Sequence, residues 1–183
     1  MMHTSSTRIL MILPCIWLAL LAPATSISDT TGRSTFIIPV DGASPTWALP
    51  MKEVLMDVQN TNNYQLKGSE ADAQWDALIP PGGGLVRMGP ENELFMLSMY
   101  HQLKCLDIIR RDYVDGWMGK NDTSPVTRHC LNYIRQMILC RGDRRLECVV
   151  DPDGAHAVEI RGTQTCRDWT QVYDGVREYT GFV

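Results

Sequence analysis

The sequence predicts one small, predominantly helical α+β domain with a few short strands and stabilising disulfides. Three observations lead to this fold class. The chain has 183 residues, 44% of them hydrophobic, which is enough for one ordinary core. Two long stretches, Asn92 to Tyr113 and Thr127 to Cys140, carry apolar residues at helical spacing with few breakers. The chain has six cysteines, and its N-terminal segment has the pattern of a secretory signal. In the oxidising secretory pathway, thiols tend to pair as disulfides.

Residues 1–24 have the pattern of a cleaved signal peptide, with an uncleaved membrane anchor as the alternative. Arg8 precedes an apolar run from Ile9 to Ala22, and small residues follow up to Ala24. The run of roughly 14 residues is short for a helix that must cross about 30 Å of hydrocarbon. We therefore expect the protein in the secretory pathway: the lumen of the endoplasmic reticulum or Golgi, a vesicle, or outside the cell. We expect contact with a membrane only if the leader stays attached.

Residues 25–59 are predicted to form an extended arm, and residues 60–183 the folded domain. The arm is rich in Ser, Thr, Pro and Gly. Its β-branched run from Phe36 to Val40 indicates an edge strand that ends at Pro39.

Three shorter elements are expected around the two long helices. A short helix is predicted from Ser69 to Leu78, with Ser69 as its N-cap, and the Pro and Gly residues at 80–84 end it in a turn. Two strand-like runs, Cys148 to Val150 and Ala157 to Ile160, flank a turn. A last helix is expected from Asp168 to Tyr179, capped by its first residue.

The cysteines predict two disulfides and one free thiol. Loss of Cys15 with the leader leaves five, and an odd number cannot pair completely. Cys130 and Cys140 lie on one predicted helix with a rise of roughly 15 Å between them, too far for a bridge. We expect Cys105 to pair with one of these two and Cys166 with the other, leaving Cys148 over. The sequon at Asn121 predicts glycosylation in the same compartment.

Charge and motifs exclude two classes of partner. A formal net charge of −4 and a pI near 5.5 argue against a nucleic-acid surface, because phosphate binding needs clustered Lys and Arg. The Gly82 to Gly84 run has no Lys-Ser or Lys-Thr pair after it and no expected strand before it. The sequence therefore predicts neither nucleic-acid binding nor a nucleotide cofactor.

Two histidines are the candidate metal ligands. His101 and Cys105 are spaced i and i+4, so both lie on one face of the first long helix. The second long helix begins with the pair His129 and Cys130. If the cysteines hold the two helices together, both imidazoles face one cleft. Imidazole is a common ligand of copper, iron and zinc, so the pattern predicts a small metal site.

Four stretches of the chain resemble the UstYa-like oxidase family in their amino-acid sequence and in their order along the chain. They are Glu70 to Met88, Tyr100 to Tyr113, Arg128 to Glu147 and Thr165 to Val172. The resemblance covers about 60–179. It implies a fungal secondary-metabolite enzyme, with ribosomal peptide mycotoxins among the products, which performs oxidative cyclisation, hydroxylation or desaturation at a copper site. It also implies a small-molecule or peptide substrate and, as a partner, a second protein of the same family in a heterodimer.

Members of that family resemble one another most in two H-x-x-H-C motifs, and this chain lacks one histidine of each. The first motif falls on His101, Lys104 and Cys105, and the second on Val126, His129 and Cys130. A further histidine that often precedes the last family cysteine is Gln164 here.

These substitutions change the chemistry that the motif can offer. Lys104 is a cation without a lone pair at neutral pH, and valine offers no donor. Two imidazoles, at His101 and His129, remain to hold copper, helped by His156, Asp107 or water. Lys104 is a third candidate catalytic residue, because a cation in the cleft can polarise a carbonyl or act as an acid. The alternative is a solvated surface lysine.

Three functions from different classes follow from the sequence. The first is an oxidoreductase in which His101 and His129 hold copper. The second is a non-redox member of the family, either a cyclase or an accessory subunit for an intact relative. The third is a secreted, disulfide-rich binding protein without catalysis.

Overall fold

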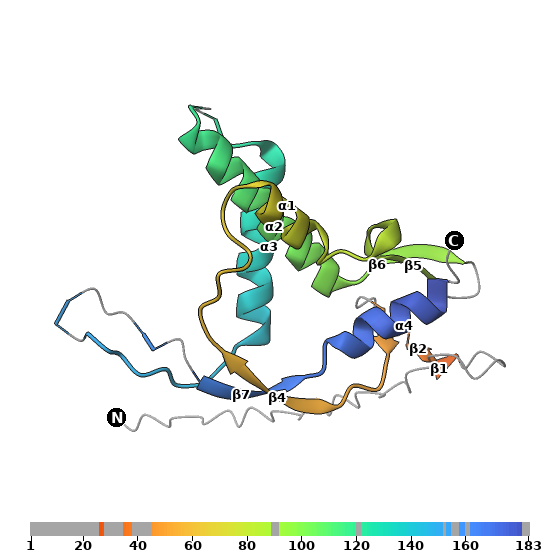
Figure 1. The fold of residues 1–183 in the computed structure, drawn as a ribbon. Coiled ribbons are helices and arrows are strands. Elements are labelled where there is room, and N and C mark those ends of the chain that lie inside the picture. The colour runs from red at the N-terminus through yellow and green to blue at the C-terminus, as the bar shows by residue number, and fades with distance from the viewer. Residues whose placement is uncertain are drawn as a thin grey trace, which may run out of the picture.

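The computed structural model describes residues 26–27, 35–37, 45–88, 92–119, 122–151, 153–154, 158–159 and 162–180. The predicted leader at 1–24, the sequon at Asn121 and the candidate ligand His156 lie outside these residues. The described part has the expected predominantly helical α+β fold (Figure 1). Its elements, in chain order, are β1 (Ser26–Ile27), β2 (Thr35–Ile37), β3 (Thr46–Ala48), β4 (Glu53–Val58), α1 (Ser69–Asp76), the 3-10 turn η1 (Pro81–Gly84), β5 (Leu85–Met88), β6 (Glu93–Met96), α2 (Ser98–Trp117), α3 (Pro125–Arg141), β7 (Gly162–Arg167) and α4 (Thr170–Thr180).

The strands of the described residues form three small antiparallel sheets. One has the order β1-β2-β3, and the others are the pairs β4-β7 and β5-β6. The strand predicted from Phe36 to Val40 is present as β2, but it is the central strand and not an edge, because β1 and β3 pair with its two sides. Strand β4, from the stretch predicted as an extended arm, pairs with β7 over its whole length, from Glu53 opposite Arg167 to Val58 opposite Gly162.

The first long helix begins later than its apolar spacing predicts. Helix α2 starts at Ser98, and the first residues of the predicted helix form β6 instead. Three consecutive apolar residues after Glu93 fit a helix or a strand. Pairing with β5 decides between the two, with Leu85 opposite Met96. Asn92 stands just before β6 with a φ of 53°, a left-handed conformation that a helix interior does not contain.

Helix α3 follows the predicted bounds to within two residues at its start. The side chain of Ser124 accepts a hydrogen bond of 3.0 Å from the backbone N–H of Thr127, which caps the first turn. Pro125 fits the first helical position because no backbone donor is needed there. Gly142 ends the helix in the left-handed region, at φ 52° and ψ 50°, and its N–H donates to the carbonyl of Ile138.

Helix α1 has the predicted place but a different cap. Gly68 occupies the N-cap position with a φ of 113°, and no side chain caps the helix, so the prediction of Ser69 as N-cap was wrong. The following turn presses against α2. Gly84 has a φ of 74°, and a Cβ placed on it would lie 2.7 Å from the ring of Tyr100. Only glycine combines that backbone conformation with so close an approach.

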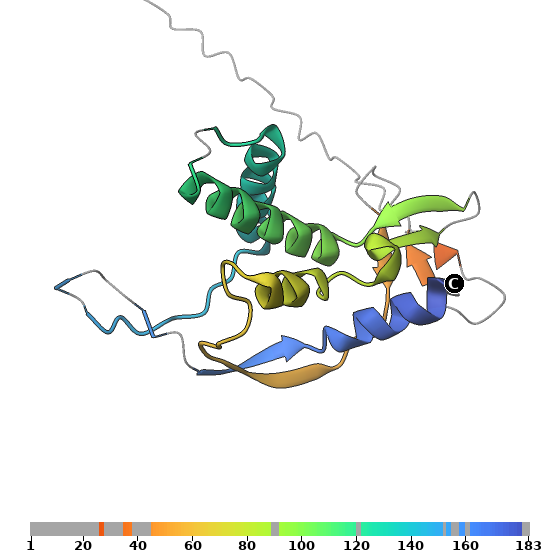
Figure 2. The ribbon, with the colours of Figure 1, turned by 45° about the horizontal axis from the view of Figure 1, so that its top comes forward.

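The core lies where the β5-β6 hairpin, the start of α2 and helix α4 meet (Figure 2). Val86 and Met88 are the buried alternate residues of β5, and Val172 and Val176 are one turn apart on α4. Tyr100 of α2 is fully buried among them. Trp47 of β3 packs against this cluster, as do Leu49 and Met51 from the segment that follows β3, and together they close one side of the core.

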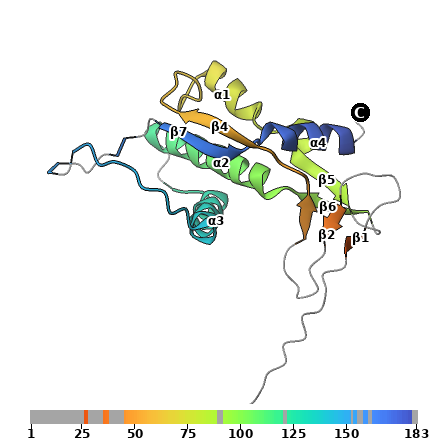
Figure 3. The ribbon, with the colours of Figure 1, turned by 90° about the horizontal axis from the view of Figure 1, so that it is seen from below.

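Two arginines of α2 hold α1 in place. Arg110, only 6% exposed, donates to Asp72 of α1 at 2.7 Å, to Asp107 at 2.7 Å and to the carbonyl of Leu66 at 2.6 Å. The neighbouring Arg111 pairs with Asp107 and with Asp76, at 2.8 Å each. These contacts fix one face of α2, whereas α3 covers another (Figure 3).

The last third of the chain contains a long connection and the final helix. Residues 142–151 are exposed and run away from the helices in Figures 1 and 2. The two predicted strand-like runs meet in a single bridge, between Val149 and Val158. The Asp168 carboxylate accepts from the N–H of Thr170 at 3.2 Å, as expected of a cap for α4. In the described part of the chain no helix is both long and apolar enough to cross a membrane.

Candidate functional site

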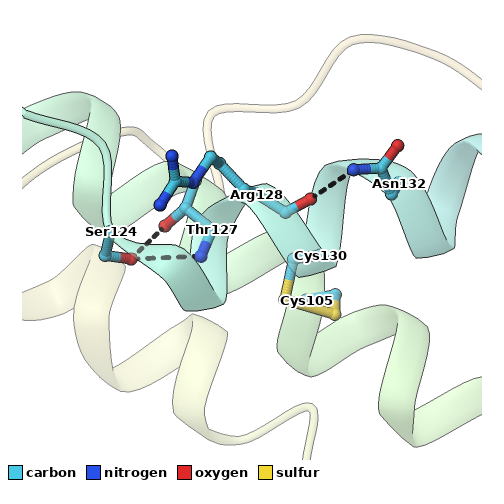
Figure 4. The surroundings of a disulfide bond; sticks show 6 residues. All are labelled: Cys105, Ser124, Thr127, Arg128, Cys130 and Asn132. Carbon is cyan, nitrogen blue, oxygen red and sulfur yellow. Dashed lines mark hydrogen bonds between the residues drawn. A yellow bond between two sulfur atoms is a disulfide. The ribbon is translucent and has the colours of Figure 1, made fainter.

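A disulfide between Cys105 and Cys130 joins α2 to α3 at the candidate site (Figure 4). The two Cα atoms are 4.8 Å apart, and each cysteine is 1% exposed. This is one of the two pairings expected for Cys105. The bridge fixes the residues beside the cysteines, because His129 precedes Cys130 directly and His101 lies one turn before Cys105.

The expected second bridge, between Cys140 and Cys166, is not formed. Cys140 is exposed in the last turn of α3, and Cys166 is half-buried on β7, where its backbone pairs with Val54. Cys148 is a third free thiol, in the exposed connection. Counting cysteines could not foresee this, because bridging depends on where helix and strand ends lie in space.

The structure brings the two candidate imidazoles together. The ring centroids of His101 and His129 are 5.8 Å apart, and the ring planes differ by 19°. His101 is half-buried and His129 is exposed. The two histidines come from different helices, so their approach depends on the packing of α2 against α3 and on the disulfide beneath them.

Tyr133 completes a cluster of three rings. It stacks on His101 with 4.0 Å between centroids and 22° between planes, and its centroid lies 6.2 Å from that of His129. Tyr133 is one turn after His129 on α3. The phenol ring therefore covers one face of the His101 imidazole and restricts its rotation.

The His101 side opens on a cavity of about 600 Å³. His101 and Tyr133 line it together with apolar side chains of the β3-β4 segment, the β5-β6 hairpin and the start of α2, among them Trp47, Leu49 and Phe95. A cavity of this size, lined by apolar side chains together with several polar ones, is typical of a site for a small organic molecule.

The surroundings of His101 favour the neutral form of its imidazole. Burial lowers the pKa of His101 below its ordinary value, and the charges of His129 and Lys104 lower that pKa further. A neutral imidazole retains the lone pair that a metal needs. His101 therefore stays available as a ligand at lower pH than an unperturbed histidine.

Lys104 does not share the cavity of His101. It lines a separate cavity of about 310 Å³ with Trp75, Asp76 and Asp107, on the side of α2 that faces α1. Its ammonium lies 3.1 Å from the position of a Cβ built on Gly83, so it rests on the glycine turn. The structure thus separates the third candidate catalytic residue from the two histidines, and its catalytic role stays a prediction.

The other residues considered as ligands lie elsewhere. The Asp107 carboxylate accepts from both Arg110 and Arg111, so its oxygens are already occupied, and it faces the cavity of Lys104. Val126 is 54% exposed in the first turn of α3. Gln164 is on β7, opposite Met56. The expectation that Asp107 helps to hold a metal was therefore wrong.

Comparison with known proteins identifies the family. The family model described as "Mycotoxin biosynthesis protein UstYa" matches residues 3–178. The chain belongs to the UstYa family. It is 27% identical over 153 residues to "UstYa family oxidase phomYb" of Diaporthe leptostromiformis, covering 74% of this chain and 61% of that protein.

A second relative of the UstYa family is "Oxidase ustYa" of Aspergillus flavus, 29% identical over 127 residues, which cover 68% of this chain and 54% of the relative. The matched regions thus span little more than half the length of these two relatives. No solved structure matches the chain.

Copper stays a prediction from the family resemblance, and the positions of the two histidines can be compared with what a metal requires. Two imidazoles that share one metal at about 2.0 Å from a ring nitrogen of each leave the ring centroids roughly 4.5 to 6.5 Å apart. The 5.8 Å between His101 and His129 falls in this range. In the described residues no third His, Cys, Asp or Glu joins them in a cluster that could hold a metal ion. By the separation of its ring centroids the pair fits two ligands of one metal, whose other positions water or substrate would fill.

Sequence reasoning missed three residues at this UstYa family site. Tyr133 lies four residues after His129, and that helical spacing was visible in the sequence. Arg141 and Arg167 also line the His101 cavity. No sequence signal joined these two arginines, because one ends α3 and the other ends β7.

Proposed function

We propose that this chain is an oxidase of fungal secondary metabolism, with mycotoxin biosynthesis as its pathway class, and that His101 and His129 hold its copper. Membership of the UstYa family and the names of the relatives support the oxidase role. The observation that carries the proposal is the meeting of two imidazoles from α2 and α3, 5.8 Å apart, at the edge of an apolar cavity.

The residues of the site have distinct tasks in this proposal. Copper bound there supplies the one-electron chemistry that dioxygen needs to react with an organic molecule. His101 and His129 hold the metal from two helices that the disulfide keeps in register. Tyr133 keeps the His101 ring in its orientation by stacking on it. The apolar side chains of the cavity hold a small-molecule or peptide substrate beside His101.

The reactions that the proposal covers differ in their demand for electrons. A desaturation or an oxidative ring closure removes two hydrogen atoms from the substrate, and dioxygen takes them up as hydrogen peroxide. A hydroxylation inserts one oxygen atom and reduces the other to water, so it needs two more electrons and two protons from an external reductant. Measurement of peroxide and of reductant consumption distinguishes the two classes.

We place this activity in the secretory pathway. The buried Cys105–Cys130 bridge supports this location, because structural disulfides persist in oxidising compartments. Cleavage of the leader and glycosylation of Asn121 stay predictions.

A second candidate is a non-redox role, as a cyclase or as an accessory subunit in a heterodimer with an intact relative. The donor set favours it: two imidazoles meet without a third ligand among the described side chains. As a cyclase the chain needs only the substrate cavity; as an accessory subunit it keeps this cavity, and the partner provides the redox centre.

Metal analysis of the purified full chain tests the first proposal. We expect one copper per chain after incubation with Cu²⁺ and removal of excess metal, and nitrogen hyperfine structure from imidazole in the electron paramagnetic resonance spectrum. His101→Ala and His129→Ala should each abolish stoichiometric binding, whereas Lys104→Met should leave it unchanged. Copper binding that survives both histidine substitutions would overturn the assignment. A metal-free chain that restores product formation by a relative would establish the second candidate.

A further inference from the structure

Two arginines line the cavity of His101, from two different elements. Arg141 is the last residue of α3, and Arg167 is the last residue of β7. The two elements do not follow each other directly in the chain, and the cavity brings one residue from each into its lining. The cavity thus has two cationic groups in addition to the imidazole.

Neither arginine has an acidic partner among the described residues. Arg110, Arg111, Arg145 and Arg177 each pair with an aspartate, whereas Arg135 and Arg144, like Arg141 and Arg167, form no ion pair with a described residue. Glu53 lies opposite Arg167 in the β4-β7 pair, yet the two side chains form no ion pair. Arg141 gains from the α3 dipole at the helix end, but this interaction leaves its guanidinium donors free.

The rest of the cavity matches an apolar molecule with one anionic end. No Asp or Glu lines it in the described part of the chain, and its other polar side chains are those of Thr46, Ser98, His101 and Tyr133. A guanidinium presents paired N–H donors that fit the two oxygens of a carboxylate. A volume of about 600 Å³ accommodates an aromatic or branched aliphatic body of several carbons beside the rings.

We propose that Arg141 and Arg167 bind the carboxylate of an apolar substrate and so orient its body toward His101. This inference rests on the proposed function, which places the reaction beside His101. It concerns substrate recognition, and binding of the carboxylate does not need the metal. A peptide C-terminus and a small apolar acid share the recognised group. The two arginines are specificity-determining residues, and they do not touch the reacting atoms.

Matched acid and amide probes test the inference by binding to the full chain. The first pair is N-acetyl-Leu-Phe with a free carboxylate and its C-terminal amide, and the second is 4-phenylbutyrate and 4-phenylbutyramide. Titration calorimetry should give about tenfold tighter binding of each acid than of its amide, because charge-assisted hydrogen bonds at a partly exposed site are worth roughly this factor. Preference for the peptide pair over the second pair identifies a peptide C-terminus, and equal affinity identifies an apolar acid.

Substitution of the arginines provides the decisive comparison. The double variant Arg141→Met and Arg167→Met should lose the acid preference to within twofold and keep its affinity for the amides. The control Arg135→Met with Arg144→Met removes the same charge at two exposed positions that do not line the cavity, and it should keep the preference. Circular dichroism establishes that each variant is folded.

The outcomes for this inference and for the copper site are separate. His101→Ala with His129→Ala should lose copper but keep the tenfold preference for the acid. Equal binding of acid and amide by the wild-type chain, no binding of the acids, or equal loss in the control variant would overturn the inference whatever the metal content.

Discussion

Replacement of Arg110 by methionine should destabilise the protein strongly, although the residue lies outside both cavities that contain candidate catalytic groups. The Arg110 side chain is 5% exposed and joins α2 to Asp72 of α1, to Asp107 and to the Leu66 carbonyl. Methionine keeps much of the apolar length but removes all of these donors. The three acceptors then face a side chain without hydrogen-bond donors.

The expected cost follows from the burial of each partner. Loss of one partner of a buried ion pair costs about 3–5 kcal/mol. The Asp72 side chain is 46% exposed and can regain water, and Asp107 keeps Arg111 as a partner. We therefore expect the lower end, about 3 kcal/mol of unfolding free energy. For a domain of this size that cost corresponds to a decrease in Tm of roughly 6–12 °C.

Urea unfolding of the oxidised protein, followed by far-UV circular dichroism, measures this difference. Arg111→Met is the matched control, because the neighbouring arginine pairs with the same Asp107 but is 44% exposed. Its loss should cost about 0.5–1 kcal/mol. If the two variants lose equal free energy, or if Arg110→Met costs less than the control, burial of the network does not hold α1 in place.

Three further predictions concern the turn, the disulfide and the cavity. Gly84→Ala should cost about 2–4 kcal/mol in the same urea assay, since the new methyl group meets the Tyr100 ring at 2.7 Å on a left-handed backbone. The double variant Cys105→Ala and Cys130→Ala should lose about 3 kcal/mol, because the bridge closes a loop with a sequence separation of 25. In metal-free buffer, the free energy of unfolding should decrease as the pH is lowered from 6.5, the ordinary pKa of histidine, through the lower pKa that His101 has in the folded protein. His101→Gln should reduce this pH dependence.

The sign of the pH dependence follows from proton binding. The pKa of His101 is lower in the folded protein than in the unfolded chain, so below the unfolded value the unfolded chain binds more protons. The stabilising contribution is complete above the unfolded pKa and is lost at lower pH. Stability that is independent of pH in the wild type, or equally dependent in His101→Gln, would contradict the assigned cause.

Controls separate these effects from general damage. Gly116→Ala places a methyl group in α2 with no heavy atom within 4 Å of it, and it should be neutral or slightly stabilising. A large loss there would show that the cost at Gly84 is not specific. For the disulfide, a reductant should destabilise the wild type and leave the double alanine variant unchanged.

Sequence patterns predicted the parts of the two long helices whose apolar spacing and capping residues lie within the helix itself or next to its ends. Ser124, Pro125 and Gly142 mark the ends of α3 by capping chemistry that needs no distant partner. The start of α2 shows the limit of such reasoning. Residues 93–96 can form a helix or a strand, and only pairing with β5, earlier in the chain, selects the strand.

The sequence by itself determined the family, the helical character and the residues His101, Cys105, His129 and Cys130, because motif spacing on a helix is a local property. Tertiary structure alone decided that the two imidazoles stand 5.8 Å apart and that Lys104 faces another cavity. It also decided that Arg141 and Arg167 line one cavity. The physical reason is that helix periodicity fixes the direction of a side chain about its own axis, whereas its neighbours depend on how separate elements pack.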